Sequence, residues 1–89
     1  MITRSVIIIN RLGLHARAAA RFVKLASVYE SNVELISEHA TINGKSIMGV
    51  MMLAAAKGTR LELRVHGPDE LESATALKKL IEDYFGEDE

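Results

Sequence analysis

Residues 12–17, with the sequence LGLHAR, place an arginine two positions after a histidine. The residues before this segment predict a strand and a turn, and those after it predict a helix that begins beside His15. A helix start offers unpaired backbone N–H groups and a partial positive charge, which together favour a bound anion. A neutral imidazole nitrogen is a nucleophile, and Arg17 would hold a phosphate well. The segment therefore predicts a histidine that carries a phosphoryl group.

Each residue of this segment has a separate expected role. His15 would be the nucleophile and later the leaving group, while Arg17 would hold the phosphoryl oxygens by charge-assisted hydrogen bonds. The backbone N–H groups of Ala16 and Arg17 would add fixed dipoles at the helix start. Gly13 would let the backbone turn tightly, so that the imidazole faces outward. The alternative is a histidine that only caps the helix or lies in solvent, which is the ordinary role of an isolated histidine.

Composition excludes several classes of site. The 89 residues are 48% apolar, which predicts a single domain over residues 1–89 with a mostly aliphatic core. The absence of cysteine excludes disulfides and thiolate ligands. His39 and His66 lack paired carboxylates at ligand spacing, so we expect surface histidines and neither metal nor cofactor. No apolar run approaches the ~20 residues of a membrane span and no signal peptide is evident, so we expect a cytoplasmic protein.

Charge is distributed unevenly along the chain. The first 30 residues carry five basic side chains and one acidic side chain, whereas the remainder carries six basic and eleven acidic ones. The basic part contains His15, as a site for an anion requires, although an ordinary solvated surface would also account for it. The net charge of −1 and the lack of aromatic residues in the predicted strands argue against an RNA-binding domain.

Hydrophobic periodicity predicts the elements that must position His15. Alternation and β-branched residues predict strands at residues 2–9, 33–36, 40–42 and 60–66. Helical spacing of apolar residues predicts helices at residues 16–28 and 47–53 and a last helix from about residue 69. The order β-α-β-β-α-β-α predicts an α+β fold, in which a four-stranded, mainly antiparallel sheet has all three helices on one face.

Three further expectations concern the ends of these helices. Gly58 is placed to cap the C-terminus of the second helix. The last helix is expected to bury one stripe, and residues 86–89 are expected to form a frayed acidic tail. The stripe consists of Leu71, Ala74, Leu77, Ile81 and Tyr84, with Leu80 beside it.

The second helix offers a regulatory residue and a surface for partners. Ser46 is predicted to cap it, which stabilises such a helix by ~1 kcal/mol. A phosphoryl group on Ser46 would instead add about −2 charge and repel acidic partners. So short a helix cannot bury every side, and exposed methionine suits a surface that meets several partners. The predicted surface for weak, transient binding consists of Ala20, Lys24, Ile47, Met48 and Met51.

Three segments resemble motifs of the HPr family, the histidine-containing phosphocarriers of the bacterial phosphoenolpyruvate-dependent phosphotransferase system. They are GLHAR at residues 13–17, NGKSIMG at 43–49 and AKGT at 56–59. The resemblance covers essentially the whole chain and implies an open-faced β-sandwich. It implies a carrier and not an autonomous enzyme: Enzyme I phosphorylates His15 at Nδ1, and His15 passes the group to a sugar-specific Enzyme IIA. It also implies regulation at Ser46 by a serine kinase/phosphorylase. We expect a monomer.

One position departs from the family pattern. Most members have proline after the arginine, whereas this chain has Ala18. Alanine is a good helix former and restores an N–H donor in the first turn, so we expect the same fold with a less rigid site. The alternative function is a regulatory phosphoprotein of the nitrogen-related phosphotransferase branch, which acts as a signalling module without sugar transport.

Overall fold

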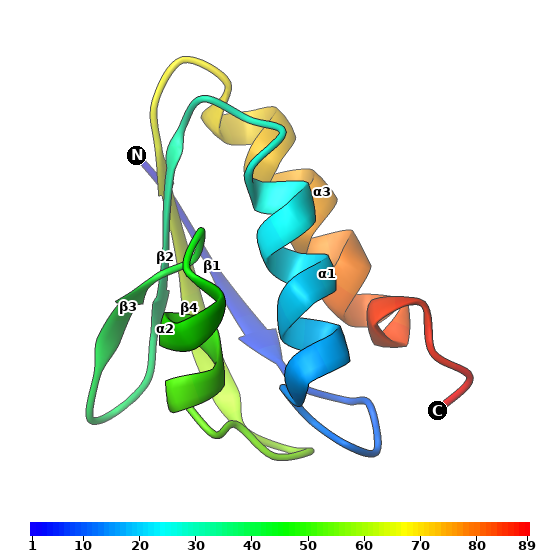
Figure 1. Ribbon diagram of the computed structural model, residues 1–89. Helices are drawn as coiled ribbons and strands as arrows, with labels where there is room; N and C mark the ends of the chain where they lie inside the picture. Colours follow the sequence, from blue (N-terminus) through cyan, green and yellow to red (C-terminus); the bar gives the residue numbers. More distant parts are fainter.

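The computed structural model describes all 89 residues and has the predicted order of elements. The strands are β1 (Ile2–Ile7), β2 (Asn32–Ile36), β3 (Thr41–Asn43) and β4 (Arg60–His66). The helices are α1 (Ala16–Ala26), α2 (Ile47–Met52) and α3 (Glu70–Glu82), followed by the 3-10 turn η1 (Tyr84–Gly86). All three helices lie on the same side of the sheet, with α1 and α3 side by side (Figure 1). The predicted α+β fold is therefore confirmed.

The sheet is antiparallel throughout, with the strand order β1-β4-β2-β3. In the central strand β4, the side chains of Leu61, Leu63 and Val65 are buried under the helices. The intervening side chains lie on the open face, where Arg64 pairs with Glu34 of β2 at 3.3 Å. This alternation is the predicted one, and it leaves one face of the sheet uncovered by helices.

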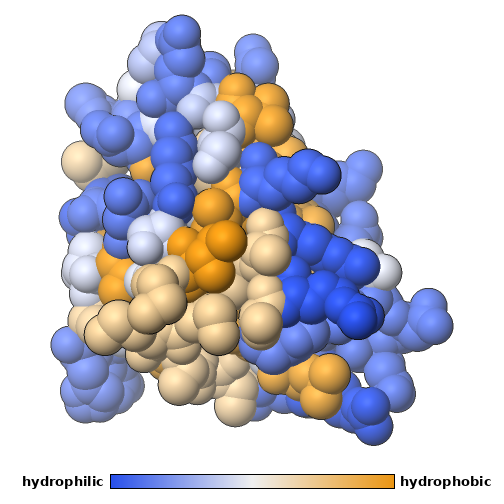
Figure 2. Space-filling model, viewed as in Figure 1, coloured by the Kyte–Doolittle hydropathy of each residue, from blue (hydrophilic) through white to orange (hydrophobic).

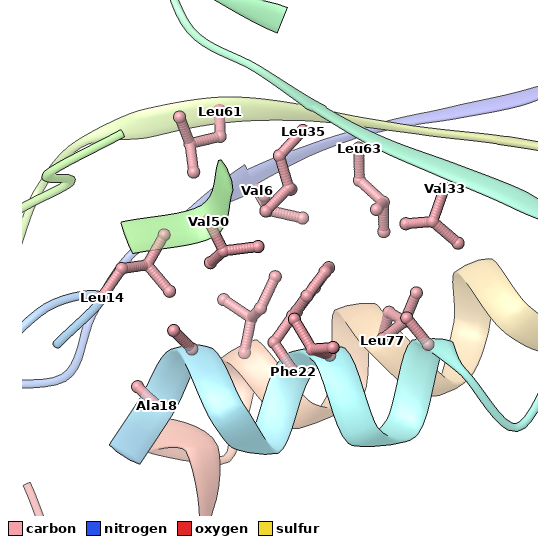
Figure 3. Packing of buried hydrophobic residues seen from close by; sticks show 14 of the residues in the cluster. Val6, Leu14, Ala18, Phe22, Val33, Leu35, Val50, Leu61, Leu63 and Leu77 are labelled. Atoms are coloured by element: carbon pink, nitrogen blue, oxygen red, sulfur yellow. The ribbon is translucent and has the colours of Figure 1, made fainter. Parts of the chain in front are cut away.

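The core forms between the sheet and the three helices (Figure 3). Helix α1 contributes the predicted stripe at i, i+3, i+4 and i+7, and Phe22 at its centre is fully buried. Val50 is the buried residue of α2, and Leu77 of α3 closes the other end of the cluster. The buried stripe of α1 is Ala19, Phe22, Val23 and Ala26, with Ala18 beside it.

The predicted stripe of α3 is wrong at both ends. Ala74, Leu77 and Ile81 are buried, but Leu71 is 60% exposed and Tyr84 is 39% exposed. Buried Ser73 shifts the centre of the stripe, and at 100° per residue Leu71 lies roughly 100° from that centre. At the other end the helix stops at Glu82, and the following turn directs another residue inward. That residue is Phe85, which is fully buried.

The predicted end of α2 is also wrong. The helix ends at Met52, and the chain turns at Ala54, which has a φ of 49° in the left-handed region. Gly58 is not its cap but belongs to the turn before β4, where its N–H donates to the carbonyl of Ile8 at 2.6 Å. Smaller differences are that β1 and α1 each end two residues earlier than predicted, and that β3 is shifted by one residue.

Candidate functional site

His15 lies at the start of α1, as the sequence predicts. It is the N-cap residue, with extended backbone angles, and its carbonyl accepts the N–H of Ala19 at 2.9 Å. Its side chain makes no capping hydrogen bond and is 28% exposed. The N–H groups of Ala16, Arg17 and Ala18 lie in the first turn, where no helical carbonyl precedes them. An anion near His15 would therefore meet free backbone donors.

Two contacts fasten the loop that presents His15. Asn10 is fully buried, and its Nδ2 donates to the carbonyl of Gly13 at 2.8 Å. The N–H of Leu14 donates to the carbonyl of Ala55 at 2.9 Å, and the Leu14 side chain packs in the core. Gly13 between them has a φ of 68°, and its α-carbon faces the backbone of Ala55 and Ala56. The loop is thus fixed on both sides of the turn.

The C-terminal segment, residues 84–89, folds back against this loop, so the predicted frayed tail is wrong. The Oε2 atom of Glu87 lies 2.9 Å from Nε2 of His15, and its Oε1 accepts from Nδ2 of Asn10, also at 2.9 Å. The segment is anchored by buried Phe85, whose carbonyl accepts from the Arg21 guanidinium. Beyond Glu87, the N–H of Arg11 donates to the carbonyl of Glu89 at 3.1 Å. Figure 1 shows the C-terminus at the same end of the molecule as the β1–α1 loop.

The surroundings of Glu87 favour its ionised form. Partial burial alone would raise the pKa of Glu87, but the hydrogen bonds from Asn10 and His15 and the charges of His15 and Arg21 outweigh it and lower that pKa. A lowered carboxyl pKa means that the contact stabilises the folded chain above the pKa of an unfolded glutamate. This stabilisation is lost as the pH falls through the lowered value.

The two residues after Ala16 face different environments. Arg17 is exposed in the first turn of α1, and the first turn contains no acidic side chain. Ala18 is fully buried and belongs to the hydrophobic core cluster at the start of α1 (Figure 3). The position at which the family pattern has proline is therefore a packed position here.

Helix α2 has the predicted cap and the predicted exposed methionines. The Ser46 hydroxyl accepts the N–H of Gly49 at 3.1 Å. Met48 is 70% exposed and Met51 is 40% exposed, so both methionines reach the surface. Figure 2 shows the apolar area over α2 next to strongly hydrophilic side chains on the α1 side. We call the following exposed residues the docking patch: Ala20, Lys24, Ile47, Met48 and Met51.

The two other histidines lie on the surface of the molecule. His39 and His66 are both exposed, as predicted. No group of three histidine, cysteine, aspartate or glutamate side chains is arranged to hold a metal ion. None of the helices combines the length and the apolar character that a membrane crossing requires.

Sequence reasoning missed Asn10 and Glu87, although one signal was available. Leu77, Ile81 and Phe85 follow one another at intervals of four residues, which is the spacing of a single helix face. An apolar residue at position 85 predicts that the chain stays docked beyond the end of α3. The acidic residues directly after it would then lie near the protein surface and not in free solvent.

The chain is similar to known phosphocarrier proteins. A family model described as "PTS HPr component phosphorylation site" matches residues 2–83. "Phosphocarrier protein HPr" of Neisseria meningitidis serogroup B is 54% identical over 89 residues, which is the full length of both chains. The solved structure of HPr-C-His from Thermoanaerobacter tengcongensis has a TM-score of 0.95 and 42% identity and covers 100% of both chains. The HPr dimer from the same organism has a TM-score of 0.78 and 42% identity, covering 98% of this chain and 100% of that chain.

Replacing Gly13 with alanine tests how firmly the loop is held. A Cβ at this position would overlap the carbonyl oxygen of Ala55 and lie 3.0 Å from Cα of Ala56, in a backbone region that L-residues rarely adopt. We expect Gly13→Ala to lower the free energy of unfolding by more than the roughly 1–2 kcal/mol of a left-handed residue alone. Gly58→Ala is the matched control, because its φ is 93° and a Cβ there meets nothing within 4 Å. Urea denaturation that shows equal losses would contradict the proposed overlap.

Proposed function

The chain belongs to the HPr family of phosphocarrier proteins of the phosphotransferase system, and from this premise we propose that His15 carries the phosphoryl group. It accepts the group from Enzyme I and passes it to an Enzyme IIA. The observation that best supports this role is the histidine at a helix start: His15 is partly exposed, and the adjoining N–H groups of α1 have no helical acceptor.

The contacts of the His15 ring support Nδ1 as the reacting atom. Its Nε2 lies against Glu87, which leaves Nδ1 as the nitrogen with a free lone pair. In the accepting step, Nδ1 attacks phosphorus while the bond from phosphorus to the donor's leaving atom breaks, and that electron pair stays with the donor. In the second step, the Nδ1–P bond breaks and its electron pair returns to the ring. The protein thus contributes position and charge, which dominate phosphoryl transfer.

The phosphoryl oxygens would be held by the start of α1. The Arg17 guanidinium is exposed two residues from His15 and can offer charge-assisted hydrogen bonds. This attraction for the phosphoryl oxygens is strengthened by the positive end of the α1 dipole and by the N–H groups of Ala16 and Arg17. No acidic side chain in the first turn opposes this charge.

The docking patch provides the surface for Enzyme I and Enzyme IIA. It combines exposed methionines with the basic Lys24, which suits weak and transient contact with acidic partner surfaces. We propose that the chain works as a monomer in the cytoplasm. Phosphorylation of Ser46 by a serine kinase/phosphorylase would add negative charge next to Ile47 and Met48. The dipole of α2 would tolerate that charge, but acidic partners would be repelled.

The first experiment identifies the phosphorylated residue. Wild-type protein incubated with Enzyme I and labelled phosphoenolpyruvate should gain acid-labile label, and His15→Ala should gain none. His39→Ala is the matched control, since His39 is exposed and distant in sequence from the site, and it should be labelled normally. Acid-labile label on His15→Ala would disprove the assignment. A panel of Enzyme IIA acceptors then separates sugar transport from the nitrogen-related signalling role.

A second experiment measures the contribution of Arg17. Loss of a charge-assisted hydrogen bond of about 1.5–3 kcal/mol corresponds to roughly 10- to 100-fold slower transfer for Arg17→Ala. Because Arg17 is exposed, the free energy of unfolding of the Arg17→Ala protein should differ from that of wild type by no more than about 0.5 kcal/mol. A variant that unfolds instead would mean that Arg17 is structural. A folded variant that transfers at the wild-type rate would mean that Arg17 does not hold the phosphoryl group.

A third experiment separates the two roles of Ser46. Aspartate is also a good N-cap, so Ser46→Asp should keep α2 stable while adding a negative charge. We expect weaker binding to Enzyme I by calorimetry, with the difference shrinking as salt is raised. Ser46→Ala adds no charge and should bind normally while losing ~1 kcal/mol of stability. Equal affinity of Ser46→Asp and wild type would exclude regulation by charge at this position.

A further inference from the structure

Glu87 contacts the ring nitrogen of His15 that would not carry phosphorus, and we propose that Glu87 is a positioning residue for phosphoryl transfer. It holds the histidine proton on Nε2 and thereby keeps Nδ1 as the nucleophile. The inference rests on the proposed role of His15 as phosphoryl carrier. Glu87 lies outside the 2–83 range of the family match, and its contact with His15 comes from the fold of the C-terminal segment.

The hydrogen-bonding chemistry fixes the direction of this contact. An ionised carboxylate only accepts hydrogen bonds, and the lowered pKa of Glu87 keeps it ionised. Its two oxygens each face one nitrogen at 2.9 Å, Nδ2 of Asn10 and Nε2 of His15. His15 must therefore donate from Nε2. A neutral imidazole has a single N–H, so its Nδ1 carries the free lone pair.

Contacts of the residues before and after Glu87 in the chain hold Glu87 in this position. Phe85, two residues before it, is fully buried, and the Arg21 guanidinium holds the Phe85 carbonyl. Two residues after it, Glu89 accepts the backbone N–H of Arg11 and pairs with the Arg11 side chain at 3.3 Å. These anchors restrict the backbone around Glu87 in advance. Less conformational entropy is then lost when its carboxylate meets the ring.

The contact also balances charge during the transfer. When neutral His15 attacks through Nδ1 with its proton on Nε2, the ring becomes substituted on both nitrogens and gains positive charge. The carboxylate of Glu87 lies against the N–H of that ring and compensates the charge, as the buried carboxylate of a catalytic triad does for its imidazolium. When the Nδ1–P bond breaks, the electron pair returns to Nδ1 and the original neutral ring is restored. No proton has to leave or enter the ring in either step.

Asn10 makes one substitution especially informative. Its Nδ2 donates to two oxygens, those of Gly13 and Glu87, so the orientation of the amide is fixed. In Glu87→Gln, the new side chain must turn its oxygen toward Asn10 and its NH₂ group toward Nε2 of His15. Nε2 then has to accept, which moves the ring proton to Nδ1 and removes the nucleophilic lone pair. Glu87→Gln therefore keeps the shape of the side chain but produces the wrong tautomer of the His15 ring.

The experiment compares four proteins: wild type, Glu87→Gln, Glu87→Ala and Asp88→Asn. Asp88→Asn is the matched control, since Asp88 is exposed and adjacent and the substitution removes the same charge. Nitrogen-15 NMR of the His15 ring at alkaline pH reports the protonated nitrogen without any partner protein. Labelling by Enzyme I and phosphoenolpyruvate reports the rate of transfer, and urea denaturation confirms that each variant is folded.

We expect the neutral ring to carry its proton on Nε2 in wild type and Asp88→Asn, and on Nδ1 in Glu87→Gln. Transfer should be at least about 10- to 100-fold slower in Glu87→Gln, which is the loss typical of changing a group that orients a metal-bound histidine. Glu87→Ala should be faster than Glu87→Gln, because water can serve Nε2 as an acceptor. A merely structural role predicts the opposite order, with glutamine the milder change.

Two results would overturn the inference: a wild-type ring protonated on Nδ1, or a folded Glu87→Gln that is labelled at least as fast as Glu87→Ala. These results are distinguishable from failure of the proposed function. If wild-type protein accepts no phosphoryl group at all, the carrier role is wrong. The NMR measurement still decides where Glu87 places the proton.

Discussion

The arrangement of the site depends on the buried side-chain amide of Asn10. Both of its donor hydrogens are used, one on the β1–α1 loop at Gly13 and one on the C-terminal segment at Glu87. Its Oδ1 has no hydrogen-bond partner within the protein, and an unpaired buried acceptor costs about 1–3 kcal/mol. An apolar residue at position 10 would avoid this cost, but it could not form hydrogen bonds to the loop and to the C-terminal segment. Asn10 therefore trades stability for a fixed relation between two segments that are 77 residues apart.

The rest of the fold makes this relation possible by holding α1 from three sides. The buried stripe of α1 faces the sheet, and α2 and α3 pack beside it. Ala18 in its first turn belongs to this core, so the helix start is set by packing as well as by hydrogen bonds. A rigid helix whose first turn is open to solvent presents its N–H groups without further reorganisation. Proline at position 18 is therefore not required to place the helix start.

Local patterns in the sequence predicted most of the fold, because each depends on residues only a few positions apart. The stripe of α1, the alternation of β4, the Ser46 cap and the position of His15 are all of this kind. The errors cluster at residues whose backbone the sequence does not signal. Ala54, Tyr84 and Phe85 have positive φ values although none is glycine. The first ends α2 before Gly58, and the other two redirect the chain so that Phe85, and not Tyr84, is buried. Tertiary packing decides such conformations, and no local propensity predicts them.

The contact between Glu87 and His15, which the sequence did not predict, also changes how the uneven charge distribution is interpreted. In the sequence, a basic first third and an acidic end look like separate surfaces, and His15 belongs to the basic one. In the fold, Glu87 and Glu89 return to that same region, so His15 lies between an acidic segment and the basic start of α1. A ring that gains a phosphoryl group must accommodate negative oxygens and positive charge on the ring at the same time. A uniformly basic site would favour the oxygens and oppose the ring charge. Under the proposed role of His15, charges of both signs serve the carrier better, because they stabilise both parts of the phosphorylated histidine.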